Sequence, residues 1–230
     1  VVHYVMGGIH TNIEGETPLP GLFAAGECAC VSINGANRLG SNSLTELLVF
    51  GARAARAAVR FGAQSGEIAA EEITALASQE QERIRQRYFQ PSNGGEKIAE
   101  LRAELTGTME DGAGIYRTEE SLRSSCDVIR GLKERSRQIE LADHSLTFNT
   151  ELTTALELEY MLDVAEALAH SALARTESRG SHQRSDYPDR NDDEFLKHSL
   201  AYQTDGDPRI EYLDVVITRW PPGERVYGSK

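Results

Sequence analysis

The chain has 230 residues, of which 40% are hydrophobic and 26% charged, and its formal net charge is -12. This composition is typical of a soluble globular protein, and the acidic balance argues against a surface built for nucleic acid, because phosphate contacts need clustered lysine and arginine. No apolar run reaches membrane-spanning length, and three cysteines are too few for a disulfide framework, which favours a reducing compartment.

Charge and glycine are unevenly distributed along the chain. Residues 1–62 contain four acidic and four basic residues, so their sum is zero and the deficit of -12 lies in residues 63–230. Nine of the 20 glycines also fall in the first 62 residues, where they indicate sharp turns or close backbone approaches. A neutral, glycine-rich segment followed by a charged segment predicts two units with different roles.

The first unit is predicted to consist of short strands and loops that lead into one helix. Leu22–Ala25 is a short apolar run between two glycines, which favours a buried strand. The stretch 28–42 is rich in asparagine and glycine and is therefore interpreted as a loop. A helix is expected over about Leu44–Arg60, with Ser43 and Glu46 at the spacing of a capping box.

The second unit is predicted to be mainly helical. Residues 67–88 have an amphipathic pattern, and three further helices are expected from apolar positions with helical spacing. These positions are Ile98, Leu101, Leu105 and Met109; Leu122, Cys126, Ile129, Leu132 and Ile139; and Leu152, Leu156, Met161, Val164, Leu168 and Leu173. Consecutive helices with short connections favour an antiparallel bundle. A final pair of strands, 197–203 and 209–218, is predicted around a turn at 205–208.

Isolated cysteines and histidines are weak candidates for chemistry. Cys28 and Cys30 could form half of a metal site, but no second pair follows at zinc-site spacing, so small buried thiols are the favoured interpretation and no metal ligand is assigned. His170 and His182 could act as acid–base groups, yet nothing near them in the sequence defines such a role.

The segment Gly35–Ser43 is a stronger candidate because it directly precedes a helix. Backbone amides at a helix start carry partial positive charge and suit an anionic or electron-rich ligand group. Arg38 adds a fixed cation whose planar donor fork matches a carboxylate. The alternative is an ordinary loop-to-helix connection with a surface arginine, and both interpretations remain open at this level.

An ordered set of motifs resembles the succinate dehydrogenase / fumarate reductase flavoprotein family. The motifs are His3–Ile9, Gly21–Glu27, Gly35–Ser43, Glu46–Gly51, Gly114–Arg117, Phe148–Thr150, Glu177–Arg184, Phe195–His198 and Pro221–Gly228. They span nearly the whole chain, and their order and spacing make the set far more specific than any single motif.

The resemblance implies an FAD-dependent, quinone-linked oxidoreductase that interconverts succinate and fumarate by hydride transfer with the flavin. His3 and Arg38 match the family's residues that bind the two carboxylates. The cofactor-binding positions implied by the motifs are His3, Tyr4, Glu27, Arg38, Leu39, Gly40, Ser41, Asn42, Ser43 and Leu44. Glu27 would bind FAD hydroxyls, and Arg38 to Leu44 would line the flavin ring.

The family also has a Gly-x-Gly-x-x-Gly turn after its first strand, and this sequence contains no such turn. The proton-donating arginine and the flavin-linking histidine would likewise lie upstream. The resemblance therefore implies a C-terminal part that holds about half of an FAD site, with no catalytic residue of its own and no activity in isolation. The expected fold is α+β and mainly α: the end of an FAD-binding domain (1–62), a three-helix bundle (63–180) and a small β-containing extension (181–230).

The family further implies an iron–sulfur subunit and membrane anchor subunits as partners, with this chain peripheral to the cytoplasmic face of the cell membrane. Two alternatives remain. An L-aspartate oxidase is similar through His3–Tyr4, Gly35–Arg38 and Ser41–Ser43, although Gly40 and residues 209–228 fit the dicarboxylate reductase branch better. A non-catalytic helical interaction module that carries a degraded flavin loop is the other.

Overall fold

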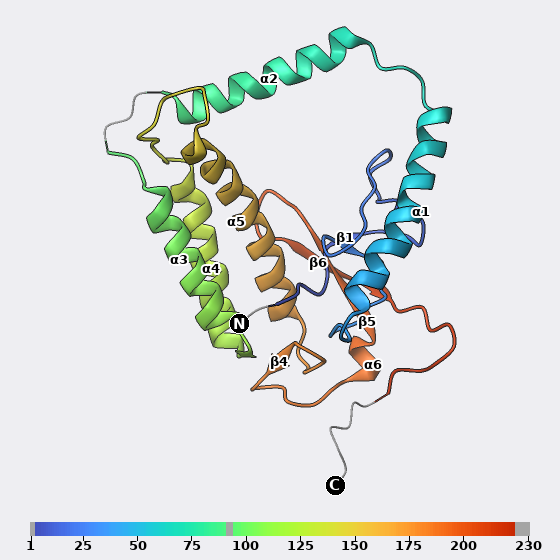
Figure 1. The fold of residues 1–230 in the computed structure, drawn as a ribbon. Helices are drawn as coiled ribbons and strands as arrows, with labels where there is room; N and C mark the ends of the chain where they lie inside the picture. The colour runs from blue at the N-terminus through green and yellow to red at the C-terminus, as the bar shows by residue number, and fades with distance from the viewer. Residues whose placement is uncertain (1–2, 91–93, 224–230) are drawn as a thin grey trace.

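The computed structural model describes residues 3–90 and 94–223 and is built mainly from helices (Figure 1). Its elements in chain order are β1 (Ile9–His10), β2 (Ala29–Cys30), α1 (Asn42–Gln64), α2 (Ala70–Tyr88), α3 (Ile98–Gly112), β3 (Tyr116–Arg117), α4 (Glu119–Ser136), α5 (Thr150–Ala174), β4 (Gln183–Arg184), α6 (Asp192–Phe195), β5 (Lys197–Tyr202) and β6 (Arg209–Asp214). The prediction of a mainly helical α+β fold is confirmed.

Helices α3, α4 and α5 lie side by side and enclose the main hydrophobic core (Figure 1). Leu101, Ile129 and Leu158 are each at most 1% exposed there. Two of the helix starts are capped as their sequences suggest: Thr118 forms a capping box with Ser121 at the start of α4, and the side chain of Asn149 accepts a hydrogen bond at the start of α5. The predicted three-helix bundle therefore forms.

The buried surface of α5 is wider than the predicted stripe. Five residues of that stripe are partly buried and pack against the core, namely Leu152, Leu156, Met161, Leu168 and Leu173, whereas Val164 is 63% exposed. The most deeply buried residues lie on a face rich in alanine, which comprises Ala155, Leu158, Leu162, Ala165, Ala169 and Ala172. Small side chains let helices approach closely, and because α5 carries apolar residues around much of its circumference, periodicity alone could not select the contact face.

Leu158 provides a direct test of this core. We expect Leu158→Ala to lower the free energy of unfolding by about 2–5 kcal/mol, because the substitution removes buried methyl groups and leaves a cavity. Leu146→Ala is the matched control, since Leu146 is 75% exposed in a loop and should change stability little. Urea unfolding of the two variants measures the difference, and equal midpoints would contradict the assignment of Leu158 to the core.

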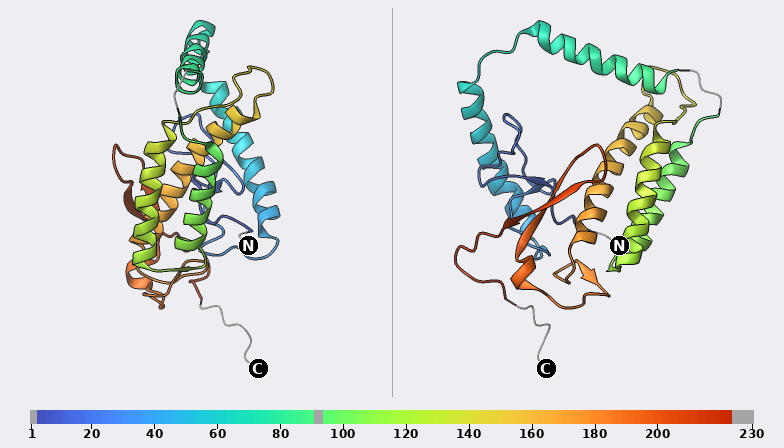
Figure 2. Two further views of the ribbon diagram at one scale, coloured as in Figure 1. Left: turned by 90° about the vertical axis from the view of Figure 1, so that its left-hand side faces the viewer. Right: turned by 180° about the vertical axis from the view of Figure 1, so that it is seen from behind.

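Helix α2 connects α1 to the bundle along one side of the molecule (Figures 1 and 2). Only its C-terminal end is anchored: Tyr88 is 2% exposed and its hydroxyl donates to Glu159 of α5, which also pairs with Arg87 at 2.6 Å. The remainder is largely exposed, including Ile73 and Leu76. The predicted helix over 67–88 is thus present from Ala70.

The N-terminal segment forms its strands at other positions than the predicted one. The run Leu22–Ala25 is not a strand; Phe23 makes only an isolated bridge with Glu16, although Ala24 is buried. Gly21 and Gly26 adopt positive φ values of 86° and 88°, so the chain turns at both ends of the run before a strand can extend. The strands in this region are instead the short parallel pair β1 and β2.

The C-terminal strands pair as an antiparallel hairpin that lies beside α5 (Figure 2). The register runs from Lys197 opposite Asp214 to Tyr202 opposite Arg209, which confirms the predicted turn between them, and β6 ends four residues earlier than the predicted 218. The Tyr212 hydroxyl donates to the Ala174 carbonyl at 3.1 Å and ties the hairpin to the end of α5. The final motif, Pro221–Gly228, extends beyond the described residues.

Candidate functional site

The loop that precedes α1 turns twice in left-handed backbone conformations before the helix begins. Gly35 has a φ of 57°, and Ser41, which occupies the N-cap position, has a φ of 66°. The Ser41 side chain makes no capping hydrogen bond, and the amides of Asn42 and Leu44 donate to carbonyls of the loop itself at 3.2 Å. The helix therefore begins with its amide end next to Arg38, and the tight turn takes the place of the predicted cap.

Arg38 is half-buried and lies against the N-terminal segment. Its guanidinium carbon is 4.4 Å from the centre of the Tyr4 ring, a cation–π distance, and its Nη1 donates to the Leu39 carbonyl at 3.0 Å. Its Nε is buried and has no hydrogen-bond partner among the described residues. Tyr4 directly follows His3, the other residue predicted to bind substrate, and His3 is exposed. Arg38 therefore lies against the residue next to His3.

Glu46, in the first turns of α1, connects the N-terminal segment at Tyr4 to the loop at Asn34. Its carboxylate is 1% exposed and accepts hydrogen bonds from the Tyr4 hydroxyl at 3.1 Å and from Asn34 Nδ2 at 2.5 Å. Burial, together with the hydrogen bond to this carboxylate, raises the pKa of Tyr4 above its ordinary value. A buried carboxylate is tolerated only when it is well hydrogen-bonded, so Glu46 holds the Tyr4 segment and the Asn34 loop together.

The prediction that Glu46 forms a capping box with Ser43 is wrong. Helix α1 begins at Asn42, so Ser43 is already inside it and Glu46 points to Tyr4 and Asn34 rather than to the helix start. The available sequence signal was an acidic residue within Leu44 to Phe50, a run that is otherwise apolar except for Thr45. Such a residue either caps locally or accepts hydrogen bonds from distant donors, and the sequence could not distinguish these roles.

Glu27 lies in the turn before β2 and not at the end of a strand, because the predicted strand at 22–25 does not form. Its Oε1 accepts a hydrogen bond at 3.1 Å from the amide of Val5, which lies two residues after His3. The side chain is exposed, and its Oε2 accepts no hydrogen bond from any residue that the structure describes. Glu27 therefore lies near the same N-terminal segment as Arg38 and retains a free acceptor.

The other predicted cofactor positions lie on the exposed side of the loop and the first turn of α1. Leu39 and Leu44 are 59% and 64% exposed, Gly40 and Ser41 are exposed, and Asn42 and Ser43 are half-buried. A Cβ atom built at Gly35 or Gly40 meets nothing within 4 Å, so there is room beside the loop. This open surface, together with the unpaired Arg38 Nε, fits a bound flavin, although contact with a cofactor stays a prediction for each residue.

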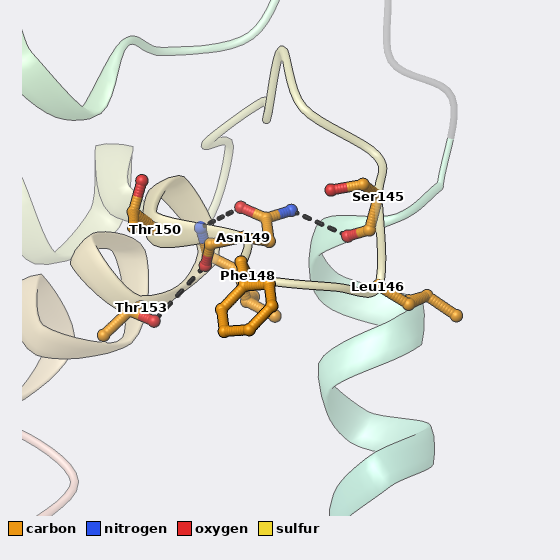
Figure 3. A pocket seen from close by; sticks show the side chains of 7 residues that line it. Ser145, Leu146, Phe148, Asn149, Thr150 and Thr153 are labelled. Carbon is orange, nitrogen blue, oxygen red and sulfur yellow. Dashed lines mark hydrogen bonds between the residues drawn. The ribbon is translucent and has the colours of Figure 1, made fainter.

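A separate surface pocket of about 400 Å³ lies where α5 begins, at the end of the molecule near α2 (Figure 3). It is lined by Ser145, Leu146, Phe148, Asn149, Thr150, Leu152 and Thr153. None of these side chains is cationic, so the pocket lacks the groups that could neutralise a dicarboxylate. The candidate site is therefore the loop of Arg38.

The surroundings of the cysteines and of His182 do not support a role in metal binding or acid–base chemistry. Cys28 is exposed and Cys30 is half-buried, so the interpretation of both as small buried thiols is wrong. Cys126 is buried, which raises its pKa to about 11, and within residues 3–90 and 94–223 no cluster of three potential metal ligands occurs. In His182, Nδ1 accepts from Arg117 Nη1 at 2.9 Å and Nε2 donates to the Arg175 carbonyl at 3.1 Å. Burial lowers the pKa of His182 to about 4, so this imidazole is neutral and occupied at both nitrogens.

Two family models match the chain: "Fumarate reductase flavoprotein C-term" over residues 102–227 and "FAD binding domain" over residues 1–44. Together with the loop before α1 and the helical bundle, these matches define a segment of a flavoprotein oxidoreductase. The chain belongs to the succinate dehydrogenase / fumarate reductase flavoprotein family, which confirms the resemblance seen in its motifs.

Fumarate reductase and succinate dehydrogenase flavoprotein subunits are both similar to almost the whole chain. The fumarate reductase flavoprotein subunit of Mycobacterium tuberculosis is 56% identical over 99% of the chain, and the succinate dehydrogenase flavoprotein subunit of Rickettsia conorii is 39% identical over 98%. A structure of E. coli quinol fumarate reductase superimposes with a TM-score of 0.91 at 46% identity, covering 99% of this chain and 39% of that one. The chain spans 40% of the length of both curated relatives.

Proposed function

We propose that this chain is the C-terminal part of an FAD-containing subunit that interconverts succinate and fumarate. The observation that carries the proposal is Arg38, a half-buried guanidinium with an unpaired Nε that stacks on Tyr4 next to His3. The names of two similar relatives, a fumarate reductase and a succinate dehydrogenase flavoprotein subunit, support the same activity. The structural surroundings of the loop give no support to a degraded site, because its polar side chains are held by specific contacts.

FAD, when bound, supplies the hydride acceptor or donor. The residues of this chain would bind and orient the dicarboxylate and the cofactor. Arg38 and His3 would each hold a carboxylate, and one charge-assisted hydrogen bond contributes roughly 1.5–3 kcal/mol. Glu27 would accept from a cofactor hydroxyl through Oε2. The segment Leu39–Leu44 would contact the ring, with the positive end of the α1 dipole close to the electron-rich side of the flavin. The hydrogen bond between Tyr4 and Glu46 would hold the segment of His3 in a fixed position relative to the loop of Arg38.

The partners and location follow from the same proposal. Structural relatives include quinol–fumarate reductase and a Mycobacterium smegmatis Sdh1 complex with UQ1. An iron–sulfur subunit would exchange electrons with the flavin, and membrane anchor subunits would link it to quinone. No helix among the described residues is long and apolar enough to cross a membrane. As the family resemblance implies, we place the chain peripherally at the cytoplasmic face of the cell membrane. We also propose domain boundaries near residues 62 and 180.

The test uses the complete flavoprotein that carries this segment. We expect a flavin absorbance spectrum, reoxidation of the reduced flavin by fumarate, and no comparable turnover of L-aspartate, which would instead identify an L-aspartate oxidase. The 230-residue chain by itself should not reduce fumarate, because it holds only about half of the FAD site. Fumarate reduction by the isolated chain, or lack of reaction between reduced flavin and fumarate in the complete protein, would contradict the proposal.

A further inference from the structure

A loop from the C-terminal part of the chain contacts the loop of Arg38 directly. The backbone amide and the hydroxyl of Ser181 both donate to the carbonyl of Ala36, each at 2.9 Å. Gly180 packs so closely that a Cβ atom there would lie 2.4 Å from the same oxygen, and its φ of 59° is one that other residues rarely adopt. Ala36 is two residues before Arg38, so this contact lies at the base of the candidate ligand loop.

The tip of this loop, formed by Gly180 and Ser181, is flanked by two networks of buried ion pairs and hydrogen bonds. Glu177, which is fully buried, pairs with Arg175 at 2.5 Å and with Arg179 at 2.8 Å. The buried side chain of Arg184 donates to the Ala172, Leu173 and Arg175 carbonyls at the end of α5, and it pairs with Asp186 at 2.8 Å. Buried, multiply bonded charges have few alternative arrangements, so the tip is held to the bundle on both sides.

A second contact joins the same two parts of the molecule. The hydroxyl of Ser32 and Nε2 of His198, on β5, share a hydrogen bond of 2.8 Å. Ser32 adopts a left-handed φ of 74° and lies four residues before Ala36. The C-terminal extension thus holds the ligand loop at two points upstream of Arg38, whereas Glu46 holds it at Asn34 from the other direction.

We propose that Gly180 and Ser181 are positioning residues for dicarboxylate binding: by fixing the Ala36 carbonyl they hold the Arg38 loop in its binding conformation. This inference rests on the proposed function, in which Arg38 grips a carboxylate. A loop that must be ordered on binding loses affinity, and a loop ordered in advance does not. The C-terminal extension thereby controls how tightly the ligand binds.

The complete flavoprotein and malonate, a small dicarboxylate, provide the test. In Gly180→Ala the new methyl group must displace Ala36, and we expect the Kd of malonate, read from the flavin spectrum, to rise by about tenfold to a hundredfold. Ser181→Ala removes one hydrogen bond and should raise Kd by about three- to tenfold, with recovery in Ser181→Thr. Gly206→Ala is the matched control, because a Cβ atom there meets nothing within 4 Å. Flavin content should be unchanged in all four variants.

Hydrogen exchange separates this inference from the proposed function. Peptides covering residues 34–42 should exchange faster in Gly180→Ala and Ser181→Ala than in the parent protein, whatever Arg38 binds. Adding Gly180→Ala to Arg38→Ala should cause little further loss of malonate binding, since both act through the same group. Unchanged exchange at 34–42, an equal effect in Gly206→Ala, or full additivity with Arg38→Ala would overturn the inference. Faster exchange together with normal malonate binding in Arg38→Ala would instead overturn the role of Arg38 alone.

Discussion

Replacing Arg38 with alanine in the complete flavoprotein should lower dicarboxylate turnover by about two to four orders of magnitude. A fork of two charge-assisted hydrogen bonds contributes about 3–6 kcal/mol, and each 1.4 kcal/mol corresponds to a factor of ten. Arg38→Lys should also lose most of the activity, because an ammonium group is a point charge and lacks the planar donor pair. Steady-state rates with fumarate and with succinate measure the effect.

Arg56→Ala is the matched control for this experiment, since Arg56 is an exposed arginine on the same helix that Arg38 precedes. Its turnover should equal that of the parent protein. Flavin content, measured from absorbance after denaturation, should change less than turnover in Arg38→Ala, because the substitution removes a carboxylate ligand and leaves most cofactor contacts in place. An unaltered rate in Arg38→Ala would remove this residue from the mechanism.

Glu177→Ala should lower the free energy of unfolding by about 3–5 kcal/mol, the usual cost of leaving buried charges without their partner. Glu177 is fully buried and accepts hydrogen bonds from Arg175, Arg179 and the Asn191 amide. Its loss leaves two largely buried guanidinium groups without their shared carboxylate. Urea unfolding provides the measurement, with Glu67→Ala as a control at an exposed position; the same midpoint in both variants would show that the network adds no stability.

The same carboxylate gives a pH dependence with a defined sign. Burial by itself raises the pKa of Glu177, but the hydrogen bonds from Arg179, Asn191 and Arg175 outweigh it, and the folded-state pKa lies below the ordinary 4.5. A depressed pKa means that Glu177 stabilises the fold above pH 4.5 and that this stabilisation is lost as the pH falls through the folded-state value. The parent protein should therefore lose stability in acid more steeply than Glu177→Gln.

Local patterns were sufficient to predict the helices and the C-terminal hairpin. Leu101, Leu105, Ile129 and Leu132 recur at helical spacing and are at most 2% exposed in the structure. The turn at 205–208, between two strand-like runs, similarly predicts the pairing of β5 with β6. The candidate loop was also visible, because glycines, an arginine and a helix start follow one another within ten residues.

Contacts between distant segments were not visible in the sequence. Glu46 had the spacing of a helix cap and proved to bind Tyr4, 42 residues away. Ser181 contacts Ala36 across 145 residues through a backbone oxygen, which has no signature in the residue type. The alanine-rich face of α5 is a third case, since its burial beside the predicted apolar stripe depended on contacts with α3 and α4.

The order of residues along the chain thus determined which segments become the long helices and which loop carries a cation suited to a carboxylate. Propensity, capping and hydrophobic spacing act over a few residues, so these features can be read locally. The tertiary structure decided which face of a helix is buried and which groups hold the Arg38 loop. Those choices depend on the shape and polarity of surfaces that meet only when the chain has folded.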